Sequence, residues 1–366
     1  MKKRLSWLGV SAIYIGVIMG AGFASGRECW QFFGVFGRKG FLGSISVTIS
    51  FLIVSFMLTY VSLSKNTTNL GKVISPVDNM FVIRGIRVIL AITYYSMLIA
   101  MTAAGGSILK QQFGLSKVVG GAIIGAAILI TVLGDFSRIS KVFKFSEPIM
   151  ISIAIITILT VILNDDISQS GMTEGFEISE MTPNWLFGSI LFVSYNSLGM
   201  ITISSDAAIN AKNKKHAFYG AAFASILLGA MTIVLLYALQ KDMAFSDSMD
   251  MPMLGYSMRI NKVLNILYTI VLCFGVYSTG SGTYYAFSSN IPSKRYKTKV
   301  LVIGAIAGYA VGLTGFKEIV SYLYPLQGYF GIVILTLVFI NFIMEIRNNR
   351  GFAIPDNKNQ QIPRNT

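Results

Sequence analysis

Residues 5–36 read LSWLGVSAIYIGVIMGAGFASGRECWQFFGVF, an apolar stretch with glycines near its middle at Gly16, Gly20, Gly22 and Gly26. As one helix this stretch would extend about 48 Å, whereas the hydrocarbon core of a bilayer is about 30 Å thick. A helix that breaks inside a membrane leaves amides and carbonyls that lipid cannot satisfy. Such a break persists only where it lines a cavity or binds a ligand. The stretch therefore predicts a membrane helix that is interrupted at a binding site.

Composition extends this interpretation to the whole chain. Its 366 residues are 54% hydrophobic and only 13% charged, and apolar runs of membrane-spanning length recur from end to end. A polytopic membrane protein is therefore expected. The predicted spanning helices cover about 5–36, 40–64, 84–110, 117–134, 142–163, 183–210, 214–240, 257–289, 297–313 and 316–345.

The charged residues that give the net charge of +14 are divided unequally between the two sides of the membrane. With the helices above, most of the 30 Lys and Arg residues fall on one side, and the loop 164–182 on the other side carries acids only. The positive-inside rule then places both termini in the cytoplasm. Residues 346–366 are polar and rich in Pro, Asn and Gln, so they are expected to form a disordered cytoplasmic tail. The charge does not indicate a nucleic-acid partner.

Motifs for enzymatic chemistry are missing from the sequence. There is one histidine and there are two well-separated cysteines, with neither a zinc-protease HExxH pattern nor a phosphate-binding GxxxxGK[ST] pattern. The sequence therefore predicts neither an enzyme nor an ATP-driven pump, and no cofactor other than a coupling ion.

The chain divides into two predicted halves, about 1–163 and 183–345, which the external loop 164–182 connects within one transmembrane domain, 1–345. The first helix of the second half has the polar sequence SYNSLG at 194–199. Ser, Asn and Gly compete with helical backbone bonds, so a second break is expected there, as in an inverted repeat. The alternative is that the glycine spacing lets continuous helices pack closely.

At these residues the chain resembles a known superfamily. The sequence GVIMGAG at 16–22 resembles the broken first helix of the APC superfamily of amino-acid and amine transporters, which share the LeuT fold. GAGFASGRE at 20–28, with the chain length and helix number, is similar to the YkvI-like group of bacterial amino-acid permeases. The resemblance implies an all-α membrane protein with a LeuT-like 5+5 inverted repeat and ten transmembrane helices, of which helices 1 and 6 are broken. It implies a symporter in the bacterial cytoplasmic membrane.

The resemblance also implies how a small amino acid or related amine is held. The amides of Ala21 and Gly22 would receive its carboxylate at the positive end of a half-helix. The carbonyl of Ile18 and carbonyls near residues 194 and 195 would face its ammonium. The hydroxyl of a helix 3 tyrosine would cap the carboxylate or, alternatively, bond locally. The implied substrate residues are Ile18, Gly20, Ala21, Gly22, Phe23, Tyr94, Tyr95, Ser194, Tyr195, Asn196 and Ser197.

A sodium ion is the coupling ion that the resemblance favours. Its implied ligands are the carbonyls of Gly16 and Met19 and the hydroxyls of Ser278 and Thr279, hard oxygen donors that suit an alkali cation. The alternative for the hydroxyls is a bond to their own helix. Proton-coupled relatives use a lysine in helix 5, where this chain has Lys141 and Lys144 only at the cytoplasmic start; Glu147 is the alternative proton carrier.

Two gates complete the expected site. Arg27 and Glu318 would close it on the outer side, with a purely structural Arg27–Glu28 neighbourhood as the alternative. Arg4 and Trp7 resemble an internal latch, for which Asp206 is the available acidic partner. Rival functions are a proton-coupled permease and a ligand-sensing subunit of the germinant-receptor type. A channel is not expected, because no repeated filter segment or charged pore ring is present.

Overall fold

The computed structural model describes residues 4–134, 136–165, 167, 176–291 and 295–348, and the side chains of 136–147 lie outside the description. All named elements of this part are helices. They are α1 (Trp7–Ile18), α2 (Ala21–Ser25), α3 (Arg27–Phe32), the 3-10 turn η1 (Gly34–Phe36), α4 (Lys39–Ser64), α5 (Leu70–Ile74), α6 (Met80–Phe113), α7 (Lys117–Leu133), α8 (Phe136–Leu163), α9 (Trp185–Ile209), α10 (Lys214–Gln240), α11 (Met243–Ser248), α12 (Pro252–Ile260), α13 (Lys262–Ser289), α14 (Lys297–Gly312) and α15 (Phe316–Asn348).

Six of the described helices, α4, α6, α9, α10, α13 and α15, are long and apolar enough to cross a membrane. Shorter apolar helices include α1 and α7. On α4 the side chains of Leu42, Ile45, Ile49 and Ile53 are exposed at helical spacing. In water such a continuous apolar stripe would be unfavourable, whereas lipid covers it without cost. The chain is therefore a multi-pass membrane protein; the count of ten crossings stays a prediction.

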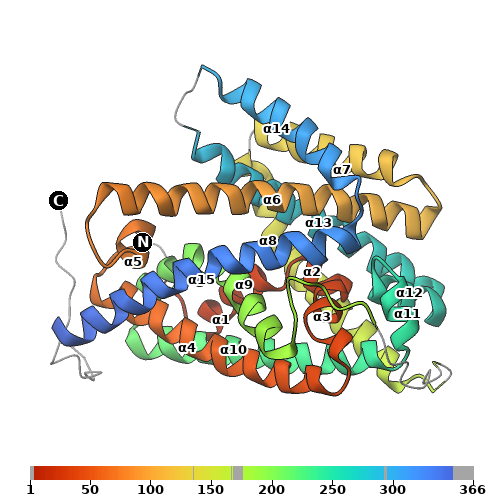
Figure 1. Ribbon diagram of the computed structural model, residues 1–366, viewed down its shortest axis with the longest axis horizontal. Coiled ribbons are helices and arrows are strands. Elements are labelled where there is room, and N and C mark those ends of the chain that lie inside the picture. Colours follow the sequence, from red (N-terminus) through yellow and green to blue (C-terminus); the bar gives the residue numbers. More distant parts are fainter. Residues whose placement is uncertain (1–3, 135, 166, 168–175, 292–294, 349–366) are drawn as a thin grey trace.

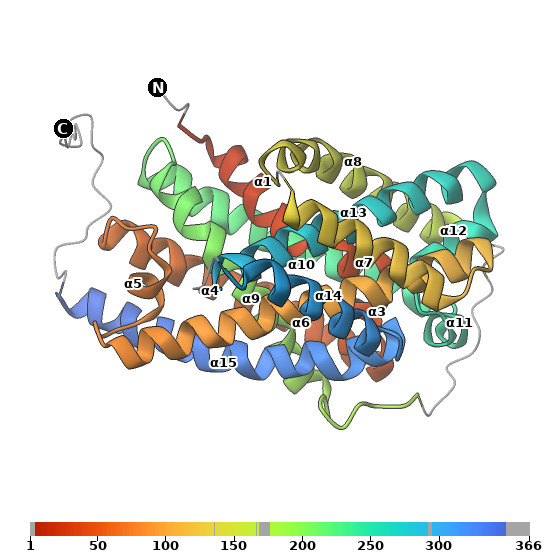
Figure 2. The same ribbon diagram turned by 90° about the horizontal axis from the view of Figure 1, so that it is seen from above.

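The helices pack in two groups that meet along the middle of the molecule. In one group α4 lies against α9 and α10, and α1 lies against α10 and α9 (Figure 1). In the other group α6 packs on α7, α13 and α14. The helix α15 contacts both α9 and α6, and α8 contacts both α13 and α10. The N-terminal end of α1 and the C-terminal end of α15 lie toward the end of the molecule that carries α5, opposite α11 and α12 (Figure 2).

The first apolar stretch is interrupted twice. The helix α1 ends at Ile18, Gly20 is extended with ψ −176°, and α2 starts at Ala21. Gly26 then adopts the left-handed conformation with φ 80° before α3 begins. A side chain at Gly26 would be strained by this φ and would also press on Met253. The excess length of the stretch is therefore taken up by short helices that change direction.

The predicted break in the helix 183–210 is wrong, because α9 is one continuous helix. The side chains that were expected to disrupt it bond to carbonyls one turn earlier. Asn196 donates to the carbonyl of Phe192 (2.9 Å), and the Ser197 hydroxyl donates to that of Val193 (2.6 Å). Such bonds leave the helical ladder intact. Gly199 instead admits Val17 of α1, as expected for close packing of helices.

At its C-terminal end the described chain is more helical than expected, since α15 continues to Asn348 instead of ending near 345. Residues 349–366, most of the expected tail, lie outside the described residues. Part of the loop 164–182 and the side chains of Lys141, Lys144 and Glu147 lie outside them as well. The division into two repeats stays a prediction.

Candidate functional site

The interruption at Met19 and Gly20 is filled from its own segment. The left-handed Gly26 turns α3 so that the Glu28 side chain returns to Gly22, where an added Cβ would overlap the Glu28 carboxyl. From α9 the Tyr195 hydroxyl donates a hydrogen bond to Glu28 Oε2. Glu28 is only 5% exposed. A carboxyl group of the chain itself thus lies beside the amides that were expected to bind a substrate carboxylate.

Aromatic rings enclose this carboxyl on the α9 side. The ring of Tyr195 stacks on Phe32 with centroids 5.7 Å apart, and Phe192 meets Tyr195 edge-on at 5.6 Å. Tyr324 of α15 lies 5.3 Å from Tyr195, and its buried hydroxyl has no hydrogen-bond partner among the residues that the structure describes. These rings exclude water, so electrostatic interactions with the carboxyl are strong.

The helix α13 forms the opposite wall. The Tyr268 hydroxyl donates to the carbonyl of Ala24 in α2, and Gly275 lets α13 approach Ala21 closely. Thr279 lies beside Gly20: a Cβ there would be 3.4 Å from Thr279 Oγ1. The Ser278 hydroxyl donates to Gly275 of its own helix at 3.1 Å, the alternative that the sequence left open. One of the two expected sodium-binding hydroxyls therefore lies at the break.

The remaining expected substrate residues divide into two sets. The first set lies at the break or lines it and consists of Ile18, Gly20, Ala21, Gly22, Phe23 and Tyr195. In the second set, Asn196 and Ser197 bond to their own helix. The carbonyls near Ser194 belong to a continuous helix and are not freed by a break. The Tyr95 hydroxyl donates to Gly304 of α14 at 3.0 Å, and Tyr94 lies beside Thr202 of α9. The site therefore depends more on the first apolar stretch, residues 5–36 (the first segment), than was expected.

On the side of α11 and α12, a network of charges closes over the first segment. Arg27 is 1% exposed, and its guanidinium donates to the carbonyls of Asp247 (3.1 Å) and Met249 (3.4 Å) and lies 3.9 Å from the Asp247 carboxylate. The same carboxylate accepts from Trp30 Nε1 (2.9 Å) and Lys317 Nζ (3.1 Å). Burial raises the pKa of Asp247, but these donors and cations outweigh burial and hold the pKa below its usual range.

A second ion pair extends this network. Lys117 lies 2.6 Å from Asp250, which also accepts from Ser107 at 2.9 Å. Burial acts against the ionised form of Asp250, yet the Lys117 bond and charge lower the pKa overall. Glu318, the expected gate partner of Arg27, lies instead beside Gly315, where Lys117 also approaches. Arg27 thus contacts Asp247 directly, and the gating role of Arg27 and Glu318 stays a prediction.

The opposite end of the first segment is held mainly by backbone. The amide of Leu5 donates to the Asn210 carbonyl, and the Leu5 carbonyl accepts from the Lys212 amide, both at 2.8 Å. The Trp7 ring meets Phe223 of α10 edge-on at 5.3 Å. Arg4 and Asp206 are both exposed and form no ion pair within the described part of the chain. The expected latch by Arg4, Trp7 and Asp206 stays a prediction.

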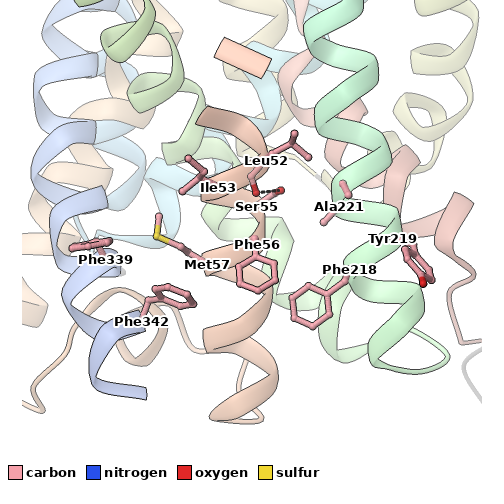
Figure 3. A pocket seen from close by; sticks show the side chains of 11 residues that line it. Leu52, Ile53, Ser55, Phe56, Met57, Phe218, Tyr219, Ala221, Phe339 and Phe342 are labelled. Atoms are coloured by element: carbon pink, nitrogen blue, oxygen red, sulfur yellow. Dashed lines mark hydrogen bonds between the residues drawn. The ribbon is translucent and has the colours of Figure 1, made fainter. Parts of the chain in front are cut away.

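An apolar hollow of about 540 Å³ lies away from the break, on the surface formed by α4, α10 and α15 (Figure 3). Phe56, Phe218, Phe339 and Phe342 line it together with aliphatic side chains. None of the expected site residues takes part. Ser55 and Tyr219 bring the only hydroxyl groups of this lining, and it has no charged side chain, so the hollow does not suit a zwitterionic solute.

Sequence reasoning missed the part that Glu28, Tyr268 and Tyr324 play. A signal for Glu28 was present, because an acid inside an apolar segment marks a functional residue by default. Nothing in the sequence indicated that Gly26 would return this acid to Gly22. The two tyrosines come from distant helices, and only the fold brings them to the site.

Comparison with known proteins supports the fold. No family model matches the chain. It is similar to the uncharacterized protein YyaD of Bacillus subtilis (strain 168), with 23% identity over 341 residues that cover 93% of this chain and 97% of YyaD. The uncharacterized membrane protein YkvI of the same organism is 23% identical over 328 residues, covering 87% and 90% of the two chains.

Two solved structures share the fold of this chain. The inward-facing conformation of Mhp1 matches with a TM-score of 0.62 and 13% identity, covering 95% of this chain and 78% of Mhp1. A manganese transporter of Eremococcus coleocola, in complex with an aromatic bis-isothiourea substituted compound, matches with a TM-score of 0.55 and 11% identity over 96% and 82% of the chains. These matches confirm the expected LeuT fold and nothing finer than the fold.

Proposed function

We propose that this protein is a secondary transporter that moves a small amino acid or related amine across the bacterial cytoplasmic membrane. The interruption between α1 and α2, enclosed by α9 and α13, carries the proposal. A helix that is interrupted inside a membrane leaves backbone donors and acceptors that need a polar ligand, and a zwitterion can satisfy both. The fold shared with Mhp1 and a manganese transporter supports transport as the general activity.

The closed charge network gives a basis for alternating access. Arg27, Trp30 and Asp247 join the first segment to α11, while Lys317 joins α11 to α15. With this network formed, the end of the site toward α11 is covered. Opening that end requires Arg27 to leave Asp247, whereas the Leu5 bonds to 210–212 hold the opposite end. We expect both termini in the cytoplasm, and the start of α1 and the end of α15 lie toward the same end of the molecule (Figure 2).

Sodium is the proposed coupling ion. The hydroxyl oxygen of Thr279 lies next to Gly20 at the break. Gly16 and Met19, whose carbonyls are the other proposed ligands, directly precede this break in the chain. Ser278 would have to release its bond to Gly275 in order to join them. Replacing Ser278 and Thr279 together by alanine should weaken the sodium dependence of uptake. Unchanged activation by sodium in this double variant would remove the site.

Thermal stability of the purified protein tests the proposal. We expect one small amino acid or amine to raise the unfolding midpoint, and sodium to strengthen the shift relative to potassium, because ligands of the native state stabilise it by mass action. Uptake into proteoliposomes then separates transport from sensing. A ligand that raises the midpoint without being taken up would support a receptor subunit, and no shift with any solute would contradict the proposed site.

A further inference from the structure

Glu28 is a buried acid without a compensating cation. Its carboxyl accepts a hydrogen bond from Tyr195 and lies against Gly22, and no described Lys or Arg forms an ion pair with it. The neighbouring Arg27 turns away toward Asp247 and donates to Gln31 at 3.2 Å. A buried ionised carboxylate that lacks a partner costs several kcal/mol. Its charge must therefore be neutralised by something that the side chains around it do not supply.

The titratable groups that face Glu28 come from three elements. Tyr195 approaches from α9 and Tyr324 from α15, close enough for electrostatic interaction with the carboxyl. On its own helix Cys29 follows, but the Cys29 thiol donates to the Thr232 carbonyl of α10 at 3.7 Å. None of these groups is a cation. Two phenol groups and one carboxyl group thus form a small polar cluster among aromatic side chains.

On the side of Gly22 the carboxyl leaves no room for a cation. A Cβ on Gly22 would overlap Glu28 Oε1, so not even a methyl group fits between them. A metal cation needs several oxygen ligands around it, and an ammonium group is at least as large as a methyl. A proton needs no additional room. Tyr324 offers an acceptor within electrostatic range of the carboxyl, because its buried hydroxyl has no hydrogen-bond partner, Glu28 included, among the described residues.

We propose that Glu28 is a proton-binding site, in which Tyr195 donates to one carboxyl oxygen and the other oxygen carries the proton, which a small shift would let it donate to the unpartnered Tyr324 hydroxyl. Coupling to transport rests on the proposed function. An ionised Glu28 would repel a substrate carboxylate at the adjacent amides of Ala21 and Gly22, whereas a neutral one would not. Binding of an amino acid and of a proton therefore favour each other, and the linkage is reciprocal. The proton moves with the solute in addition to the proposed sodium ion, and it returns to water when the site opens.

Infrared spectroscopy of the purified full-length protein tests proton binding without any substrate. We expect a carbonyl band of a protonated carboxyl that disappears in Glu28→Gln and persists in Glu180→Gln, a matched change at an exposed acid. Tyr324→Phe should shift the band, because it removes only the acceptor hydroxyl. Identical spectra for wild type and Glu28→Gln would overturn the proposal. Loss of the band when sodium chloride replaces potassium chloride would also overturn it, since the site would then hold sodium.

A second measurement tests coupling. Proteoliposomes with an inward proton gradient and the same sodium concentration on both sides are given a labelled mixture of the standard amino acids. Wild type and Glu180→Gln should accumulate label above equilibrium, whereas Glu28→Gln should exchange label without accumulation. Accumulation by Glu28→Gln equal to that of wild type would contradict coupling through this residue. If wild type takes up no label, the proposed function fails, while the infrared result still decides whether Glu28 binds a proton.

Discussion

The first segment and α9 were expected to break alike, but only the first segment is interrupted. In residues 7–32 the chain forms three short helices, separated by an extended Gly20 and a left-handed Gly26. In α9 a comparable mixture of small and polar residues lies within one helix of 25 residues. The difference is in where the polar groups find partners. Asn196 and Ser197 reach carbonyls one turn back, whereas glycines have no side chain to do so.

This comparison separates two meanings of a small residue in a membrane helix. Gly199 of α9 only makes room for Val17, so the helix continues through it. Gly26 has a φ of 80° that ordinary L-residues rarely adopt, so the helix must end there. The first kind of glycine positions neighbouring helices, and the second redirects the chain and creates a site.

Filling the space at Gly22 should have the strongest effect on solute uptake. The change Gly22→Val should abolish solute uptake, because the new side chain overlaps the Glu28 carboxyl and closes the break. Overpacking of this kind typically costs about 1–3 kcal/mol, so the protein should still be produced. Uptake into proteoliposomes and yield of folded protein measure the two effects separately.

The matched control for this change is Gly85→Val in α6, where an added Cβ has no neighbour within 4 Å. This variant should transport as wild type does. Normal uptake by Gly22→Val would show that the space beside Gly22 is not part of the site.

The network near α11 should contribute strongly to stability. The change Arg27→Ala leaves the carbonyls of Asp247 and Met249 without their buried donor and is expected to destabilise the protein by about 1–3 kcal/mol. The exposed Arg259 pairs with Asp242 at 2.9 Å, and Arg259→Ala should cost less than about 1 kcal/mol. Denaturation monitored in detergent gives both values. Equal costs would mean that the burial of Arg27 adds nothing.

Acid should weaken the same network. The pKa of Asp247 is lower in the folded protein than its ordinary value of 3.8, so its contribution is present above that value and is lost as pH falls through the folded pKa. We expect the midpoint of thermal unfolding to drop less steeply below about pH 4 in Asp247→Asn than in wild type. Parallel curves for the two proteins would contradict this assignment.

The smallest effects are expected in α9. Because Asn196 and Ser197 bond only to their own helix, Asn196→Ala and Ser197→Ala should each cost at most about 1 kcal/mol. The stabilisation of the protein by its solute should stay as in wild type. Loss of the solute-induced shift in either variant would show that the side chain takes part in solute binding, and α9 would then differ less from the first segment.

Much of the fold could be predicted because its causes are local. The length of 5–36 and the glycines within it required an interruption, and the apolar runs marked the other helices. The break expected in α9 failed because SYNSLG can be satisfied in two ways. Whether Ser197 bonds to Val193 or leaves the helix depends on the neighbours of α9, which the sequence does not reveal.

The site was less predictable because its contacts join distant segments. Glu28 reaches Gly22 only through the turn at Gly26, and its partners Tyr195 and Tyr324 lie far along the chain. Asp247 likewise meets Arg27 across 220 residues of sequence. A resemblance at 16–28 indicated where to look, but it could not name these partners.

Hydrogen exchange of backbone amides tests the contrast between the two segments most directly. We expect fast exchange at 19–22, slowed when a mixture of the standard amino acids is added, because these amides lie at an interrupted binding site. Exchange at 195–199 should be slow in both conditions, as in a continuous buried helix. Equal protection of both regions without solute, or no response at 19–22 to any solute, would show that the interruption is not a binding site.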